Sequence, residues 1–408
     1  MKVAPGRGCR DHQRSVTCVH ITAFTMSKPN VPPEIIDHIF RQLDPTTLAT
    51  CSHANPYLSA FAEPHLYADI VVFDAGETEI DAEDDRRTFL ASDLHKLLID
   101  SPQITKYVRK LEICLYTIAA DRIAPILPML LQLEVLFVTS VFYGYWQQLS
   151  REFREAFTDR LSSSFSILKE VSIIRLCNFP LSIYDNCKTV KRIGFYGQTN
   201  YEHDLEGIPP VLDSLSLRDW DHPIDPKFMD WARKCVHNLR FLSFCPRSST
   251  SINRGLPELL RMCSNSLRSL EVSLNNRNGP TCVDLSSVPH LKDLTIRSDI
   301  WFSTDQLYEA FTVLMQLLET TPHLNNLILK LTSGLYGEIT FDETDWSPLL
   351  TFLSRSSDKF QHIEIHLLHY TESIRSVDTI PQLYESEIIS DLIAKGTLDI
   401  RMKKWTVY

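Results

Sequence analysis

A short hydrophobic frame recurs over most of the chain, with apolar residues at its positions 1, 4 and 6. Positions 4 and 6 stand two residues apart, which is the spacing of side chains on one face of a strand. Successive copies begin 22 to 36 residues apart, so each leaves room for one strand and a return segment. The ten copies are Val108-Leu111-Ile113, Leu133-Leu136-Val138, Leu168-Val171-Ile173, Val190-Ile193-Phe195, Leu212-Leu215-Leu217, Leu239-Leu242-Phe244, Leu267-Leu270-Val272, Leu291-Leu294-Ile296, Leu324-Leu327-Leu329 and Phe360-Ile363-Ile365.

The intervals between these copies contain amphipathic patterns that predict helices. These patterns cover Gln148 to Leu161, Asp225 to Val236, Thr304 to Glu319 and Trp346 to Leu353. Stacked units of this kind predict an α/β fold in the form of a curved solenoid with a parallel concave sheet. The array resembles irregular leucine-rich repeats, although it lacks their regular Asn or Cys at position 9. An ordinary α/β sheet protein is the alternative, and the low glycine content, 12 residues in 408, disfavours its nucleotide-binding forms.

Residues 32 to 67 carry the start signals of three short helices. Pro32-Pro33 opens the first, and Asp44-Pro45 and Asn55-Pro56 each provide an N-cap followed by proline at the first helical position. Asp69 to Phe73 reads as a strand because β-branched residues crowd it. Three helices this short cannot bury all their apolar surface among themselves, so we expect a partner or the following domain to cover some of it.

The segment Val31-Pro-Pro-Glu-Ile-Ile-Asp-His-Ile-Phe-Arg-Gln-Leu-Asp-Pro-Thr-Thr-Leu-Ala-Thr-Cys-Ser resembles an F-box. His65-Leu-Tyr-Ala-Asp-Ile-Val-Val resembles the sequence that often follows the box in fungal F-box proteins. The family's leading Leu-Pro is Val31-Pro32 here, and Tyr57 stands nearest to the place of its common tryptophan. The resemblance implies a short three-helix domain that docks on a Skp-family adaptor. The residues that would carry this docking are Pro32, Pro33, Ile35, Ile36, Ile39, Phe40, Leu43 and Leu48.

The chain divides on these signals into four segments. We expect a flexible tail over 1–25, an F-box over 26–73, an acidic loop with a connecting helix over 74–100, and a leucine-rich-repeat-like solenoid over 101–408. The connecting helix is expected from Arg86 to Asp100. Met26 directly precedes the patterned sequence, and we interpret it as a candidate natural start.

Charge and cysteine usage narrow the partners and the compartment. With 41 basic and 51 acidic residues the net charge is −10, which argues against nucleic-acid binding. The ten cysteines show no zinc-type spacing and predict reduced, mostly buried thiols in a cytoplasmic or nuclear protein. No apolar run reaches the length of a membrane span, so we expect no membrane partner.

No sequence motif points to catalysis, since nucleophile elbows, P-loops, H-E-x-x-H motifs and paired Cys/His signatures are absent. His362, His366 and His369 have a spacing close to that of a metal site. Strand alternation places His362, Glu364 and His366 on one face, which we interpret as a polar strand face. We therefore expect a non-enzymatic protein without a metal or other cofactor. An unrecognised catalytic site in the solenoid is the alternative.

Positions 3, 5 and 7 of each frame point away from the core, onto the concave face. From the fourth copy on, basic and aromatic side chains gather there, and these are the types enriched at binding hot spots. On an acidic protein such a strip favours an acidic or phosphorylated target. The candidate target-binding residues are Arg192, Tyr196, Arg218, Arg297 and Lys330.

The resemblance implies the substrate-recognition subunit of an SCF-type cullin-RING ubiquitin ligase. The box would dock on a Skp-family adaptor and through it on a cullin, while the repeats bind a target protein. The alternative is a non-catalytic leucine-rich-repeat scaffold outside ubiquitin ligases, in which the box is a vestigial cap. Co-purification with the adaptor separates the two.

Overall fold

The computed structural model describes residues 31–74, 86–116, 120–163, 166–185, 187–197, 201–202, 207–218, 224–245, 249–273, 284–300, 311–333 and 346–404, except for residues 313, 317, 319, 320, 322, 370–382 and 384. The chain divides into two units, residues 1–43 and 44–408. The predicted tail therefore lies outside the described residues, as does most of the predicted helix over Thr304 to Glu319.

Each of the first three helices begins at the proline that the sequence indicates. In the smaller unit, α1 (Pro33–Phe40) has proline at its first position. The larger unit opens with α2 (Pro45–Ala54) and α3 (Pro56–Leu66). The side chain of Asp44 accepts a hydrogen bond from the Thr47 N–H at 2.9 Å, and that of Asn55 accepts one from the Tyr57 N–H at 2.7 Å.

The larger unit is built on a parallel sheet of 13 described strands. From β3 onward the strands lie side by side in chain order, whereas β1 lies between β2 and β3. A separate pair joins β6 (Phe179–Pro180) to β8 (Tyr201–Glu202). The strands of the large sheet are β1 (Asp69–Phe73), β2 (Arg87–Leu90), β3 (Lys110–Leu115), β4 (Val135–Tyr145), β5 (Glu170–Cys177), β7 (Arg192–Tyr196), β9 (Ser214–Arg218), β10 (Phe241–Cys245), β11 (Ser269–Ser273), β12 (Asp293–Ile300), β13 (Asn326–Ser333), β14 (His362–His369) and β15 (Leu398–Lys404).

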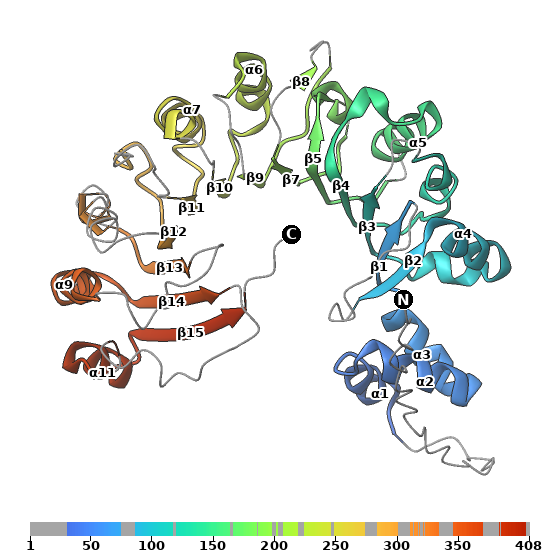
Figure 1. Cartoon of the computed structure of the whole chain (residues 1–408), viewed down its shortest axis with the longest axis horizontal. Coiled ribbons are helices and arrows are strands. Elements are labelled where there is room, and N and C mark those ends of the chain that lie inside the picture. The colour runs from blue at the N-terminus through green and yellow to red at the C-terminus, as the bar shows by residue number, and fades with distance from the viewer. Residues whose placement is uncertain are drawn as a thin grey trace, which may run out of the picture. The chain divides into compact units, whose positions relative to one another are not determined.

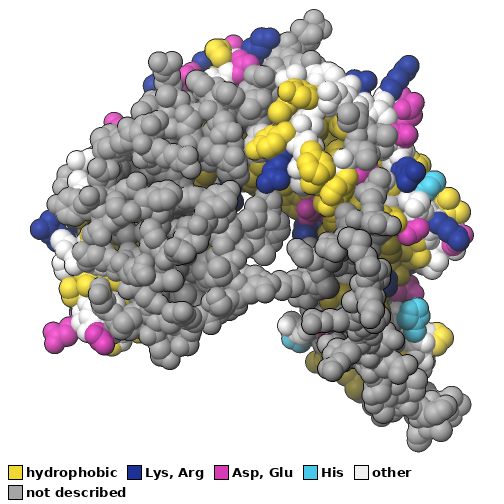
Figure 2. All heavy atoms as spheres, in the orientation of Figure 1, with side chains coloured by type: hydrophobic (Ala, Val, Ile, Leu, Met, Phe, Trp, Pro, Cys, Tyr) yellow, Lys and Arg dark blue, Asp and Glu magenta, His cyan; other side chains and the backbone are white. Residues whose placement is uncertain are grey.

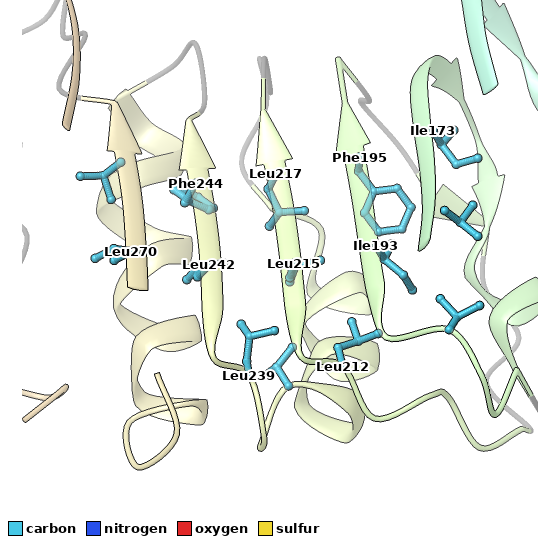
Figure 3. Packing of buried hydrophobic residues seen from close by; sticks show 14 of the residues in the cluster. Ile173, Ile193, Phe195, Leu212, Leu215, Leu217, Leu239, Leu242, Phe244 and Leu270 are labelled. Carbon is cyan, nitrogen blue, oxygen red and sulfur yellow. The ribbon is translucent and has the colours of Figure 1, made fainter. Parts of the chain in front are cut away.

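All ten copies of the hydrophobic frame coincide with strands of this sheet. Positions 4 and 6 of each copy pair with the same positions of the next, as Leu215 does with Ile193 and Leu242. Figure 3 shows these side chains in rows across neighbouring strands, with Leu212 and Leu239 just before the strands begin. All thirty frame residues are at most 7% exposed, so the frame is the core of the sheet.

The residue at position 2 of the first nine frames connects neighbouring copies through its backbone. Its carbonyl accepts hydrogen bonds from two consecutive N–H groups of the following copy, as Lys169 O does from Lys191 at 2.8 Å and Arg192 at 3.0 Å. The same arrangement recurs from Ala68 to Asn325. Because only the backbone takes part, this contact requires no particular side chain.

Helices cover one face of the sheet. Within the larger unit the strands line the inner side of an arc, and the helices lie on its outer side (Figure 1). Residues of every α-helix in the following list join the frame residues in one hydrophobic core. The helices are α4 (Ala91–Asp100), α5 (Arg151–Ser162), α6 (Pro226–Cys235), α7 (Ser249–Met262), α9 (Ser347–Ser356) and α11 (Glu387–Ala394), and the short 3-10 turns are η1 (Pro102–Lys106), η2 (Ala120–Arg122), η3 (Leu127–Met129), η4 (Trp146–Gln148), η5 (Leu181–Tyr184) and η7 (Ser357–Lys359).

The architecture is thus the predicted mixed α/β fold with a large parallel sheet, but two boundaries differ. The expected helix from Arg86 begins only at Ala91, because Arg87–Leu90 pairs with β1 as an edge strand. Such tertiary pairing overrides a weak helical preference. β1 also belongs to the large sheet, so the sheet starts at Asp69 within the segment assigned to the F-box.

Two further expectations concern polar and sulfur-containing residues. Residues 75–85 of the predicted acidic loop lie outside the described part, while Asp74 is buried and accepts a hydrogen bond from the Tyr116 N–H at 2.8 Å. Asp74 is therefore not part of a solvated loop. Seven cysteines lie in the described part, and all are free, six of them buried. None of the described helices is long and apolar enough to cross a membrane.

Candidate functional site

The face of the sheet opposite the helices carries three rows of side chains, from positions 3, 5 and 7 of each frame, and two of these rows form the site. One row, the middle row, lies between positions 4 and 6 of each frame, and the other, the carboxyl row, follows position 6. Both alternate with the buried core positions and so project from the opposite face, which we call the inner face. The carboxyl row consists of Phe73, Cys114, Thr139, Ile174, Tyr196, Arg218, Cys245, Ser273, Arg297, Lys330, His366 and Arg401.

Glu271 in the middle row is the centre of a charged cluster on the inner face. It lies on β11 and is only 3% exposed. Arg218 on β9 reaches its carboxylate at 2.5 Å, and Lys330 on β13 reaches the other oxygen at 3.0 Å. Both cations come from two strands away, because their long side chains span the intervening strand. The cluster therefore ties five consecutive strands together through one carboxylate.

A hydroxyl group completes the hydrogen bonding of this cluster. Ser243 on β10 donates to Glu271 Oε2 at 3.0 Å, and Arg218 Nε donates to Ser243 Oγ at 3.0 Å. The Arg218 guanidinium also stands over the ring of Tyr196, 5.7 Å from its centroid. Contacts with Ser243, Glu271 and Tyr196 therefore fix the orientation of the planar Arg218 guanidinium.

The charge of Glu271 is stabilised by its neighbours. Burial by itself opposes ionisation, but the positive charges of Arg218 and Lys330, and the more remote one of Arg297, outweigh it and lower the pKa of Glu271 below its ordinary value of 4.5. The carboxylate is therefore ionised at neutral pH, and it faces more than one cation.

A second cluster lies farther along the inner face, around Glu364 on β14. Its oxygens contact Nε2 of His362 at 3.2 Å and Nε2 of His366 at 2.8 Å. Arg401 on β15 approaches at 3.5 Å and also pairs with Asp399 at 2.5 Å. The predicted polar strand face is thus observed for His362, Glu364 and His366, while the side chain of His369 lies outside the described part. No group of His, Cys, Asp or Glu in the described part is arranged to hold a metal ion.

The structure brings some of the predicted target-binding residues together and leaves one apart. Tyr196, Arg218 and Lys330 belong to the Glu271 cluster, and Arg297 acts on it electrostatically. Arg192 lies at the start of its strand and pairs instead with Glu170 at 2.6 Å, where its side chain is half exposed. Glu271 occupies position 5 of its frame, so the sequence pattern places it on the concave face. The pattern does not identify it as the centre of a cluster, because strand alternation does not tell which long side chains converge.

The predicted adaptor-binding residues separate into two groups. Ile36, Phe40 and Leu48 are buried, and Leu43 is half-buried. Pro32, Pro33, Ile35 and Ile39 are exposed, with Ile35 at 52% and Ile39 at 50%. Only the exposed group is available to a partner without rearrangement of the chain.

Comparison of the sequence with protein-family models and with curated proteins found no match. Function is therefore inferred from the exposed face of α1 and from the inner face of the sheet.

Proposed function

We propose that this chain is the substrate-recognition subunit of an SCF-type cullin-RING ubiquitin ligase, docking through its F-box-like segment on a Skp-family adaptor. The observation that carries the proposal is the exposed isoleucine pair Ile35 and Ile39 on α1. The two residues stand four apart and therefore share one face of the helix. They lie within the segment that resembles an F-box.

Exposed isoleucines on a short helix favour a protein partner. Fully burying an exposed isoleucine contributes about 1.5 to 3 kcal/mol. Since each of the two is about half exposed, a partner that covers the pair gains about as much as from burying one such side chain. Val31, 41% exposed, lies just before the same helix and extends the apolar surface. The polar alternative, a solvated helix face, does not account for three large apolar residues in nine positions.

The second half of the proposal is a leucine-rich-repeat-like solenoid that holds a target. The in-register frames, the parallel sheet and the inner face with its fixed charges support this interpretation. A receptor of this kind performs no bond chemistry. It holds the target close to the charged conjugating enzyme, which replaces an encounter between free molecules by one at high effective concentration.

The test is co-expression of the full chain with a Skp-family adaptor from the same source, followed by size-exclusion chromatography with light scattering. We expect a one-to-one complex for the natural sequence. The double variant Ile35→Ala and Ile39→Ala is expected to lose the complex while its thermal unfolding stays close to that of the natural chain, because both side chains are exposed.

A matched control is the double variant Ile99→Ala and Ile393→Ala, which removes two exposed helical isoleucines from α4 and α11. It is expected to keep the complex. A well-folded natural chain that elutes alone would contradict the proposal and favour the protein-binding scaffold outside ubiquitin ligases.

A further inference from the structure

A group of exposed aromatic side chains lies at the end of β4, beside the inner face. The pairing of β4 with β5 shifts register between Thr139 and Gly144, where β5 advances only from Ile174 to Leu176. Irregularities of this kind redirect side chains out of the regular strand pattern. Phe142 and Tyr143 lie in this stretch and are 72% and 47% exposed.

Contacts to neighbouring strands hold these rings in place. Phe142 meets Tyr116 edge-on at 6.4 Å between ring centroids, and Tyr116 in turn meets Phe73 of the carboxyl row at 5.8 Å. The guanidinium of Arg175 stands over the Tyr143 ring at 5.9 Å. We call Tyr116, Phe142, Tyr143 and Arg175 the aromatic shelf. Figure 2 shows hydrophobic side chains gathered around a basic one over the part of the sheet where Figure 1 places β4 and β5.

Gly197 connects the shelf to the charged cluster. A side chain at this position would meet the Arg175 stem at 3.4 Å and the Tyr143 ring at 3.6 Å, and the φ of +68° also favours glycine. The Gly197 N–H donates to the Arg218 carbonyl at 2.9 Å. The shelf and the strand that carries Arg218 are therefore neighbours.

The carboxyl row that continues from this point is cationic. It contains Arg218, Arg297, Lys330 and Arg401 and no acidic residue, although the protein as a whole has a net charge of −10. Glu112, Glu271 and Glu364 stand in the middle row instead, and Glu170 and Asp293 stand in the row before position 4. An approaching ligand thus meets apolar rings first and a line of positive charge beside them.

We propose that the aromatic shelf and the adjoining carboxyl row form one binding surface for an acidic peptide segment that carries a large apolar side chain. The apolar side chain packs on Phe142 and Tyr143, and the carboxylates lie along Arg218 to Lys330. This proposal rests on the proposed function in one respect, that the bound peptide belongs to the target protein of the ligase. The surface itself needs no adaptor.

The composition of the surface favours a protein segment over nucleic acid. Nucleic acids bind through their phosphates to dense clusters of positive charge. Here the acidic Glu271 and Glu364 stand in the row next to the cations and reduce that charge. Exposed aromatic rings beside arginines are the typical makeup of protein-binding hot spots. The cations are already oriented by their contacts, so little ordering is required when a ligand binds.

The test is selection of a random twelve-residue peptide library on the immobilised full chain, followed by fluorescence polarisation with the enriched peptides. We expect enriched peptides that combine Leu, Phe or Trp with two or more Asp or Glu. Their affinity is expected to fall at least fivefold between 50 and 300 mM salt, because the charged contacts are screened.

Two substitutions, one at an exposed ring and one at a partly buried lysine, probe the two halves of the surface. Phe142→Ser and Lys330→Gln are each expected to weaken peptide binding five- to tenfold. The matched controls are Leu131→Ser, a 61% exposed residue outside the shelf, and Arg151→Gln, a 78% exposed cation on α5. Both controls are expected to leave binding unchanged. Thermal unfolding of each variant verifies that the fold is intact.

Three results would overturn the inference. These are the absence of any enriched peptide, enrichment without acidic residues, and enriched peptides insensitive to both Phe142→Ser and Lys330→Gln. Tight binding of a labelled oligouridine that competes at this surface would assign it to nucleic acid instead. Adaptor binding is measured on the same preparations, so loss of one activity with the other retained tells which of the two proposals fails.

Discussion

Two carboxylates of the inner face, Glu271 and Glu364, occupy the same position of their strands but have different partners. Glu271 is 3% exposed and contacts an arginine and a lysine, Arg218 and Lys330. Glu364 is 19% exposed, contacts two histidines closely, and has its arginine only at 3.5 Å.

The difference shows how the same strand pattern produces two electrostatic environments. A buried carboxylate requires permanent cations, because an uncompensated charge there is very unfavourable. A more exposed carboxylate keeps part of its hydration and can be satisfied by histidine. We therefore expect the first cluster to determine stability and the second to contribute little.

The largest expected effect comes from removing the charge at the first cluster. Glu271→Gln leaves Arg218 and Lys330 facing a neutral amide in a nearly buried position, and we expect a loss of about 2 to 3 kcal/mol in the free energy of unfolding at pH 7. Glu364→Gln is expected to lose about 1 kcal/mol or less. Urea unfolding of both variants measures the difference, and equal losses would contradict the comparison.

The next prediction concerns pH. Because the folded protein lowers the pKa of Glu271, its contribution is fully present above the ordinary value of 4.5 and is lost as the pH falls through the lower folded value. The stability gap between the natural chain and Glu271→Gln is therefore expected to narrow from pH 7 toward pH 3. A stability difference that stays constant over this pH range would show that the loss does not come from removing the negative charge of Glu271.

A smaller effect separates the two cations of the cluster. Arg218→Ala removes the contacts to both Glu271 and Ser243, while Lys330→Ala removes only one. We expect losses of about 1.5 and about 1 kcal/mol, respectively. A double-mutant cycle with Glu271→Gln measures the coupling energy of each cation with Glu271. A coupling energy near zero for Arg218 would mean that this ion pair does not stabilise the folded protein.

The smallest effect is expected at the start of the strands. Arg192 pairs with Glu170, but their side chains are 51% and 25% exposed. Exposed pairs contribute about 0 to 1 kcal/mol, so Arg192→Ala is expected to change stability by less than about 0.5 kcal/mol. A loss as large as that of Arg218→Ala would mean that an ion pair at the start of a strand contributes as much to stability as the pair in the Glu271 cluster.

Most of the sheet was predictable because burial follows a strict period. The spacing of Leu215 and Leu217, repeated ten times, is enough to place a strand and its buried face. Three strands of the same sheet, β1, β2 and β15, do not carry the frame. Position 1 is Tyr67 for β1, Asp84 for β2 and Lys395 for β15, so none of the three has the aliphatic residue or Phe that marks a copy there.

The site was less predictable, for geometric reasons. The convergence of Arg218 and Lys330 on Glu271 depends on the curvature and register of five strands, which no local pattern encodes. The aromatic shelf depends on the irregular pairing after Thr139, where the strand alternation no longer tells which way Phe142 points. The division of the α1 residues into exposed Ile35 and buried Ile36 likewise required the three-dimensional structure.

In the proposed function α1 and the inner face bind separate partners, the adaptor and the target. Hydrogen–deuterium exchange of the full chain with and without a Skp-family adaptor tests this division directly. We predict that protection on adaptor binding is concentrated in peptides covering residues 31–43, while peptides covering 210–273 exchange as in the free chain. Protection over the inner face, or none over α1, would contradict it.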